Sequence, residues 1–258
     1  MNDNLERFLK NQLNTDFIGK LIYYYPSVTS TMEIAKNLAK KGATEGTIVI
    51  ADQQTSGRGR LGRAWLSPNS NLAISIILHP PLSCFTKLIM VASVAVVRAI
   101  ENTTGIKAEI KWPNDVMIKG KKVCGILIEN EIKSSIVDFS VIGIGININL
   151  NPIAFPEISA LATSLSHELG KEVARAQVTC SLLSELEKLY LQAKSGISMY
   201  KEWQKNMETL GKLVRVQSGE SVEQGKAEAV TENGNLILRH PNGSFSEIIA
   251  GDVTIIKD

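Results

Sequence analysis

The nine residues from Gly57 to Trp65, Gly-Arg-Gly-Arg-Leu-Gly-Arg-Ala-Trp, constrain this chain more than any other stretch. Glycine is costly inside helices and strands, so three glycines here indicate a loop that adopts unusual angles or approaches a ligand closely. Backbone N–H groups in such a loop can form a nest for anions, and the three guanidinium groups match phosphate or carboxylate. The stretch predicts a clamp for a small anion with an apolar body. The competing interpretation is a solvated basic loop or an Arg/Gly patch for nucleic acid.

The charge of the whole chain is nearly balanced. There are 28 Lys and Arg residues against 26 Asp and Glu residues in 258, which gives a net charge of +2. Positive charge is concentrated locally, in the loop at 57–63 and at Lys119, Lys121 and Lys122. Local charge on a near-neutral body favours a small anionic ligand over a DNA duplex, so no nucleic-acid partner is expected.

Cysteine usage and hydropathy point to the cytoplasm. Cys84, Cys124 and Cys180 are far apart and odd in number, so they predict neither a disulfide framework nor a metal site, and the three histidines are scattered. The N-terminus lacks the pattern of a signal peptide. The longest apolar run, 88–97, is far shorter than the ~20 residues that span a bilayer. We therefore expect a cytoplasmic protein with no membrane partner.

Periodicity and turn signals divide the chain into strands and helices. One helix begins at a Ser30-x-x-Glu33 capping box and ends before Gly42. Strands are expected at 20–25 (stopped by Pro26), 47–51, 71–79, 107–111, 116–118, 122–129 and 135–148, and the other helices at 5–14, 86–102, 161–169, 175–194 and 197–207. Short strands joined by Asn-Gly turns follow at 212–217, 222–231, 235–240, 244–250 and 253–257. We expect one domain over 1–210 and a small β-barrel domain over 211–258.

The second informative stretch is Lys111-Trp112-Pro113-Asn114-Asp115. Pro113 must stop a strand because it lacks an N–H, and Asn114 and Asp115 could simply cap the turn. A lysine, a tryptophan, an amide and a carboxylate beside one rigid break also suit a nucleotide site. Asp115 is a candidate for holding Mg²⁺, which favours few carboxylates together with substrate phosphate.

Glycines inside two predicted strands indicate that something lies close to the backbone there. Gly125 follows Lys122 in one strand, and Gly143 and Gly145 form a flat shelf in the next, which ends at Asn147. A lysine at the start of a strand is usually a solvated end, and the second strand is a core strand under either interpretation.

Together these motifs resemble those of biotin–protein ligases, also called biotin–[acetyl-CoA-carboxylase] ligases. The stretches 57–65, 111–115 and 143–147 occur in the order and approximate spacing of that family, and Ser30-Thr31-Met32 is similar to its Ser-Thr-Asn element. The similarity extends from about residue 22 to the end of the chain. It implies an α/β (α+β) fold, in which a mixed, mainly antiparallel sheet is flanked by helices and followed by a small SH3-like barrel.

The resemblance also implies the roles of individual residues. Met32 departs from the family's frequent Asn, so one side-chain hydrogen bond to the ligand is lost there. The implied catalytic residues are Lys122, Arg58 and Arg60. The implied biotin-binding residues are Ser30, Thr31, Met32, Gln54, Arg58, Gly59, Arg60, Lys122 and Gly125. The positions implied around ATP or the adenylate are Arg63, Trp65, Lys111, Asn114, Asp115 and Asn147.

The implied reaction joins two anions. The carboxylate of biotin attacks the α-phosphorus of ATP, pyrophosphate leaves, and a lysine of a carrier protein then takes biotin from biotinyl-5′-AMP. Arg58, Arg60, Lys122 and Mg²⁺ would offset the repulsion between the reactants, and the Arg/Gly loop would close over the adenylate to exclude water. The default carrier is the biotin carrier subunit of acetyl-CoA carboxylase, and other biotin-dependent carboxylases are alternatives. Family members often associate edge to edge, but the sequence leaves the formation of a homodimer open.

Three alternatives compete with this interpretation. A biotin-sensing repressor would need a helix-turn-helix domain, and only about 20 residues precede the strand at 23–25. The related lipoate–protein ligases share a similar core fold, but the Arg/Gly loop together with Lys-Trp-Pro-Asn-Asp favours biotin. A binding scaffold without activity is disfavoured by the presence of Lys122, Arg58 and Arg60.

Overall fold

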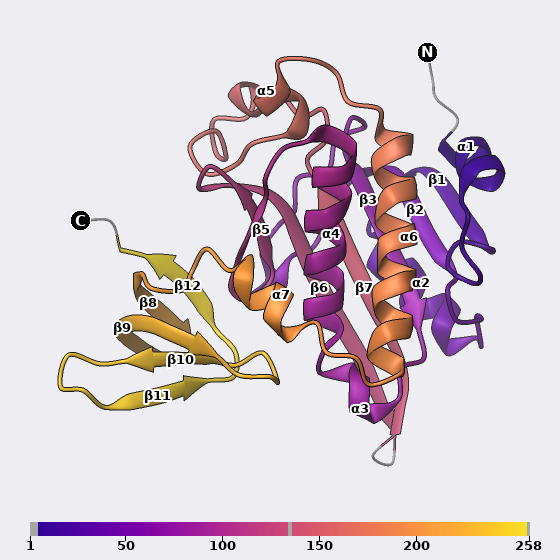
Figure 1. The fold of residues 1–258 in the computed structure, drawn as a ribbon. Helices are drawn as coiled ribbons and strands as arrows, with labels where there is room; N and C mark the ends of the chain where they lie inside the picture. The colour runs from indigo at the N-terminus through magenta and orange to yellow at the C-terminus, as the bar shows by residue number, and fades with distance from the viewer. Residues whose placement is uncertain (1–4, 134–135, 257–258) are drawn as a thin grey trace.

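The computed structural model describes residues 5–133 and 136–256. Three parts of the predicted elements lie outside this range: residues 1–4 of the first domain, residue 135 of the strand predicted at 135–148, and residues 257–258 at the end of the small domain. A seven-stranded sheet forms the larger part of the molecule, and a five-stranded sheet follows it (Figure 1). Among the described strand pairs of the large sheet, only β1–β2 is parallel, so the predicted mixed, mainly antiparallel sheet is confirmed. The order across the large sheet is β1 (Ile22–Val28), β2 (Ile48–Gln54), β3 (Leu72–Leu78), β7 (Ile136–Ile146), β6 (Lys121–Lys133), β5 (Asp115–Ile118) and β4 (Glu109–Lys111).

Helices cover the two faces of the large sheet unequally. Helices α4 (Leu88–Thr104) and α6 (Arg175–Lys194) run side by side over one face, while α2 (Thr31–Lys40) packs on the other (Figure 1). Strand β3 alternates accordingly, because Ile74 and Ile76 join the core under α4 and Ile77 joins a smaller cluster with α2. The remaining helices are α1 (Leu5–Gln12), α3 (Leu82–Phe85), α5 (Leu165–Leu169) and α7 (Tyr200–Lys205).

Small residues on three strands allow other side chains to approach the backbone on the α2 face. Ala73 and Ser75 of β3 pair with Gly145 and Gly143 of β7, and Gly145 pairs in turn with Gly125 of β6. Three neighbouring strands therefore present a patch almost without side chains on the face away from α4 and α6. This patch is the glycine shelf (Gly125, Gly143 and Gly145), and it positions the candidate site.

Three local predictions are wrong, each for a physical reason. Strand β1 continues through Pro26 to Val28, because it is an edge strand and Pro26 has no partner in its register. The capping box does not form, since the Ser30 side chain makes no cap bond and Glu33 pairs with Arg58 instead. Helix α5 begins only at Leu165, because residues 161–163 bond to the backbone of Lys122.

The five-stranded sheet is antiparallel throughout, as expected for a small C-terminal β unit. Its link to the large sheet includes the Trp112 indole Nε1, which donates a 2.8 Å hydrogen bond to the Gly234 carbonyl. Within the described ranges, no helix is long and apolar enough to cross a membrane. In sheet order the strands are β11 (Phe245–Ile248), β10 (Leu236–Arg239), β9 (Ser221–Val230), β8 (Leu213–Ser218) and β12 (Asp252–Ile255).

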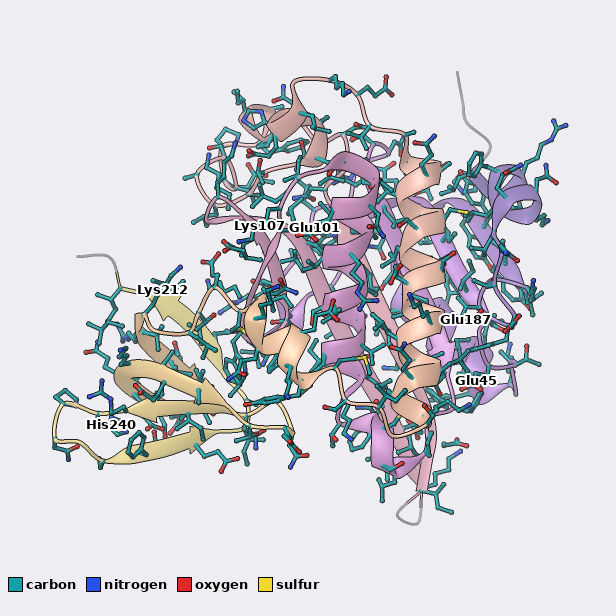
Figure 2. All side chains as sticks on the ribbon, viewed as in Figure 1. Glu45, Glu101, Lys107, Glu187, Lys212 and His240 are labelled. Atoms are coloured by element: carbon teal, nitrogen blue, oxygen red, sulfur yellow. The ribbon has the colours of Figure 1, made fainter. Side chains whose placement is uncertain are left out.

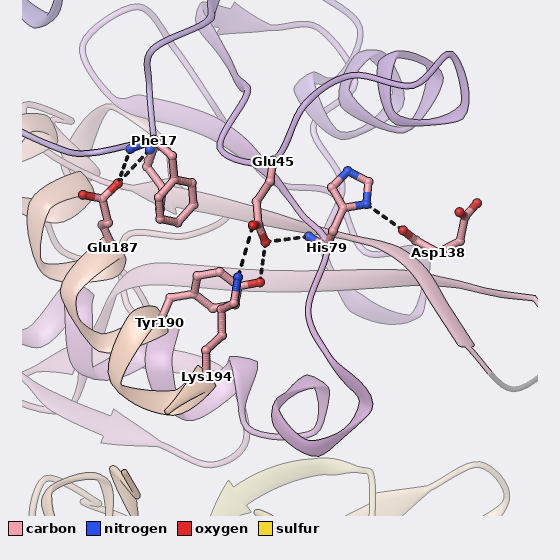
Figure 3. Close-up of polar contacts among 8 residues, drawn as sticks. Phe17, Glu45, His79, Asp138, Glu187, Tyr190 and Lys194 are labelled. Carbon is pink, nitrogen blue, oxygen red and sulfur yellow. Dashed lines mark hydrogen bonds and ion pairs between the residues drawn. The ribbon is translucent and has the colours of Figure 1, made fainter. Parts of the chain in front are cut away.

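Two acidic residues join distant segments to α6. Figure 3 shows the Glu45 carboxylate, which accepts hydrogen bonds from the Tyr190 hydroxyl at 2.6 Å and the His79 backbone N–H at 3.0 Å and pairs with Lys194. Burial opposes the charged form of Glu45, but these hydrogen bonds and Lys194 outweigh it and lower its pKa. Glu187, labelled in Figures 2 and 3, is buried and accepts backbone N–H bonds from residues 16–18 at 2.5 to 2.9 Å.

Glu187→Ala should destabilise the protein by about 3 kcal/mol, because three backbone donors lose a charged acceptor at once. The exposed Glu172→Ala is the control and should change stability by less than about 0.5 kcal/mol. Urea unfolding followed by circular dichroism measures both. Equal urea midpoints for the two variants would show that the Glu187 hydrogen bonds to residues 16–18 do not stabilise the protein.

Candidate functional site

A cavity opens on the α2 face, above the glycine shelf. The Arg/Gly loop between β2 and β3 forms one wall, and the start of α2, the strands β5 to β7 and the first residue of β12 form most of the rest. Its lining includes Ser30, Thr31, Met32, Gln54, Arg58, Gly59, Arg60, Arg63, Ala64, Trp65, Asn114, Asp115, Lys122, Gly125, Leu127, Gly143, Gly145 and Asp252. The Arg/Gly stretch at 57–65 and the Lys-Trp-Pro-Asn-Asp stretch at 111–115, about fifty residues apart in sequence, thus both contribute to one cavity.

One end of the cavity is polar and buried. The Gln54 side-chain oxygen accepts hydrogen bonds from the Thr31 backbone N–H at 2.9 Å and from its hydroxyl at 3.1 Å, and the Ser75 hydroxyl donates to the Thr31 oxygen. The Ser30 hydroxyl is buried and has no hydrogen-bond partner among the described residues. Buried polar groups are normally paired, so an unpaired hydroxyl in a cavity wall indicates a ligand partner.

The middle of the cavity is flat and apolar. The Trp65 indole lies against Gly145, where an added Cβ would overlap the ring, and against Gly125, where the gap would be 3.0 Å. Met32 packs on Gly143, and an added Cβ there would be 2.5 Å from its sulfur. The indole Nε1 of Trp65 is buried without a partner in the described part of the chain. Glycine is needed at these positions because the Trp65 ring and the Met32 sulfur approach the backbone so closely.

Lys122 lies between the shelf and the Lys-Trp-Pro-Asn-Asp turn, whose Trp112–Pro113 peptide is cis. Its ammonium nitrogen is 2.6 Å from the Asp115 carboxylate and 5.4 Å from the centre of the Trp65 ring. Its backbone N–H donates to the Leu161 carbonyl, and its backbone carbonyl accepts from the Thr163 N–H, both at 2.9 Å. A half-buried ammonium group fixed by a carboxylate and an aromatic face is positioned to meet an anion that enters the cavity.

The three arginines of the loop have different partners. Arg58 pairs with Glu33 of α2, whereas the Arg60 guanidinium donates to the Asn114 side chain at 3.0 Å and to the Gly251 carbonyl at 3.3 Å. Arg63 pairs with Asp252 at 2.5 Å. Asp252 lies 192 positions after Arg60 in the sequence, and no local signal could have revealed that the C-terminal sheet contributes a carboxylate to this cavity.

Two residues predicted around ATP do not line the cavity. Lys111 is the last residue of β4 and lies opposite Asp115 in the backbone register of the β4–β5 hairpin. Its side chain is not part of the cavity lining. Asn147 is buried, accepts from Asn71 at 3.1 Å and donates to the Thr163 carbonyl at 3.1 Å. The other predicted site residues all lie in the lining, and their ligand roles stay predictions.

The chemistry available in the cavity is electrostatic. Burial raises the pKa of the Cys124 thiol, although Lys122 next to it acts in the opposite direction, so Cys124 is no nucleophile at neutral pH. Across the described ranges, no group of three or more His, Cys, Asp or Glu could hold a metal ion. His240, labelled in Figure 2, lies on the small C-terminal sheet and is not part of the cavity lining. Asp115 and Asp252 are the carboxylates of the lining, which suits an ion that arrives with phosphate.

Comparison with known proteins agrees with this geometry. The profile of the "Biotin/lipoate A/B protein ligase family" matches residues 24–147, and that of the "Biotin protein ligase C terminal domain" matches residues 209–255. The bifunctional ligase/repressor BirA of Bacillus subtilis is 38% identical over 249 residues, which cover 94% of this chain and 76% of that protein. The biotin–[acetyl-CoA-carboxylase] ligase of Mycobacterium tuberculosis is 28% identical over 265 residues, with 98% and 96% covered.

A solved structure is similar over almost the whole chain. The biotin protein ligase of Aquifex aeolicus in complex with biotin and ATP superposes with a TM-score of 0.79 at 32% identity. The match covers 93% of this chain and all of that one. By its two profile matches and its identity to these proteins, the chain belongs to the biotin/lipoate A/B protein ligase family, among the members that carry the C-terminal domain of biotin protein ligases.

Proposed function

We propose that this chain is an ATP-dependent biotin ligase, which activates biotin as biotinyl-5′-AMP and transfers it to a lysine of a carrier protein. One observation supports this best: a single cavity joins a buried polar end, a flat apolar shelf and a cluster of cations. Biotin has a polar ureido head, an apolar ring system and a carboxylate tail. Each part of the cavity therefore has a counterpart in the ligand.

The polar end favours biotin over lipoate. Ser30, Thr31 and Gln54 offer donors and acceptors that a ureido group satisfies. The dithiolane ring of lipoate has no hydrogen-bonding head and would leave the Ser30 hydroxyl unpaired. Met32 lines the cavity over Gly143 and offers no hydrogen-bonding side chain, so recognition of the head rests on these three residues.

The first step forms a bond between a biotin carboxylate oxygen and the α-phosphorus of ATP, while the bond from that phosphorus to the pyrophosphate oxygen breaks. The Lys122 ammonium and the Arg58 and Arg60 guanidinium groups offset the charge that both anions bring. Asp115 would hold Mg²⁺ together with the phosphates, and the ion would supply further positive charge at the triphosphate. The Arg/Gly loop shields the resulting mixed anhydride from water.

In the second step, the neutral amine of a carrier lysine attacks the carbonyl carbon of the adenylate and AMP leaves. No enzyme nucleophile takes part, in keeping with the buried thiol of Cys124. The proposed carrier is a biotin carrier domain such as that of acetyl-CoA carboxylase, as in the name of the M. tuberculosis relative. The use of ATP and the free cysteines among the described residues support a cytoplasmic location. No role for nucleic acid is proposed.

The edge of β6 supports a homodimer as a further part of the proposal. Strand β5 pairs with β6 only from Lys121 to Gly125, and Asn114 bonds both backbone groups of Ile126. From 127 to 133 the described pairings of β6 are with β7 alone. An unpaired edge can accept another strand, from a second copy or from a carrier. Sedimentation equilibrium across a concentration series measures self-association.

Ser30→Ala should weaken biotin binding about 3- to 10-fold, because one hydrogen bond to the ureido head is lost. Ser67→Ala is a matched control, since the Ser67 hydroxyl is also buried without a partner among the described residues but does not line the cavity. Isothermal titration of biotin, with lipoate in parallel, measures both variants. Binding of lipoate as tight as that of biotin would move the function to lipoate ligation.

A further inference from the structure

The Arg/Gly loop is part of the long connection between the core strands β2 and β3. Its two legs pair from the end of β2 onward, where the Gln54 N–H donates to the Ser67 carbonyl at 3.1 Å and the Trp65 N–H donates to the Gly57 carbonyl at 2.9 Å. The cavity-lining arginines lie between these bonds and the tip of the loop. Their position therefore depends on how the two legs are held at the base, where the chain leaves β2 and enters β3.

Arg175, the first residue of α6, bonds to both sides of that base. Its Nη2 atom donates to the Asp52 carboxylate at 2.6 Å, on the strand that leads into the loop. Its Nη1 atom donates to the Asn69 and Asn71 carbonyls, each at 3.3 Å, on the leg that leads out. One rigid guanidinium fork thus joins the entry and the exit of the loop, which a lysine could not do with the same geometry.

The partners of Arg175 are themselves fixed. The Tyr24 hydroxyl donates to the second oxygen of Asp52, and burial followed by that hydrogen bond raises the Tyr24 pKa, so the hydroxyl remains a donor. The Asn71 side chain accepts from the Ile148 N–H and donates to Asn147, both at 3.1 Å. Arg175 is mostly buried and does not line the cavity. A residue so placed influences a ligand only through the loop.

We propose that Arg175 is a positioning residue that sets the spacing of the loop base and thereby keeps Arg58, Arg60 and Trp65 directed toward the cavity. This inference concerns the loop, and its link to biotin and ATP rests on the proposed function. Without Arg175 the binding-competent arrangement of the loop is populated for a smaller fraction of the time. A ligand that needs that arrangement then binds more weakly by the same fraction, whereas the chemical step at saturation is unchanged.

Limited trypsin digestion of the ligand-free protein tests the positioning directly, because trypsin cleaves after arginine and the loop carries Arg58, Arg60 and Arg63. In Arg175→Ala, cleavage at these three sites should be about tenfold faster than in the unmodified protein. The matched control is Arg98→Ala, since Arg98 is also mostly buried and joins two carboxylates, Glu185 and Glu202, far from the loop. It should lower the melting temperature without speeding cleavage in the loop.

Asp52→Asn keeps the shape of the base and removes one charge, so it reports on the contact even if Arg175→Ala does not fold. It should give an intermediate rate of loop cleavage, and Arg175→Lys should do the same. Loop cleavage unchanged in Asp52→Asn and in a folded Arg175→Ala would overturn the proposal. An equal increase in the rate of loop cleavage in Arg98→Ala would also overturn the proposal, because general destabilisation would then be the cause.

A kinetic readout separates this proposal from the proposed function. In adenylate formation, Arg175→Ala should raise the KM for ATP and the Kd for biotin by a similar factor, about tenfold, and leave kcat within about threefold. A fall in kcat with unchanged KM would overturn the positioning role. If the unmodified protein forms no adenylate, the proposed function fails, while the trypsin result still decides whether Arg175 holds the loop.

Discussion

Lys122→Ala should slow adenylate formation by about 10²- to 10³-fold. The Lys122 ammonium is fixed by Asp115 at 2.6 Å and lies over the Trp65 ring, at the junction of the shelf and the arginines. Two anions must meet there, and an ordered positive charge offsets their repulsion more effectively than water does. Removal of the Lys122 ammonium also takes away the ion-pair partner that positions the Asp115 carboxylate.

The neighbouring Lys121→Ala is the matched control, because Lys121 begins the same strand but does not line the cavity. It should retain activity within about twofold, as expected for a change away from the site. Lys122→Arg keeps the charge with a different shape and should recover part of the loss. Release of pyrophosphate in single-turnover experiments measures all three. Near-normal turnover of Lys122→Ala would remove Lys122 from the reaction.

The glycine shelf provides the second large effect. Gly145→Ala should weaken ligand binding by about 5- to 150-fold, since overpacking of a filled site costs about 1–3 kcal/mol. The new Cβ would overlap the Trp65 indole, so the ring has to move into the space of the ligand. The backbone at Gly145 is an ordinary strand, and the effect is therefore steric and not conformational.

A graded series provides the control. An added Cβ would lie 3.0 Å from the Trp65 ring at Gly125 but 3.4 Å from the nearest atom at Gly59. The loss of biotin affinity should therefore decrease from Gly145→Ala to Gly125→Ala to Gly59→Ala, while thermal melting shows that each variant folds. If the order were absent or reversed, ligands would not use the shelf.

Much of the site follows from sequence because its motifs are local. The Arg/Gly stretch and the Lys-Trp-Pro-Asn-Asp turn each carry their chemistry in a few consecutive residues, and both line one cavity. The shelf was also predictable, since a glycine inside an apolar strand often marks a bulge or a close approach to the backbone. The sheet and the long buried helix α4 follow from strong hydrophobic patterns, because such patterns specify which face is buried.

The remaining features depend on tertiary contacts that no local pattern reveals. Asp252 reaches the cavity only because the small sheet docks beside the Lys-Trp-Pro-Asn-Asp turn. Asn147 follows the shelf in sequence but is drawn into a buried network with Asn71 and Thr163. Glu33 leaves its expected place in a capping box because Arg58 offers it a stronger, charged partner. In each case a long-range pairing overrides a local preference.

The central claim is that this cavity activates biotin with ATP. The most direct test is to incubate the purified protein with biotin, ATP and Mg²⁺ and to detect biotinyl-5′-AMP and pyrophosphate, with lipoate in a parallel reaction. We expect adenylate and pyrophosphate with biotin and neither with lipoate. Adenylate with lipoate, or none with biotin despite measurable binding, would contradict the account.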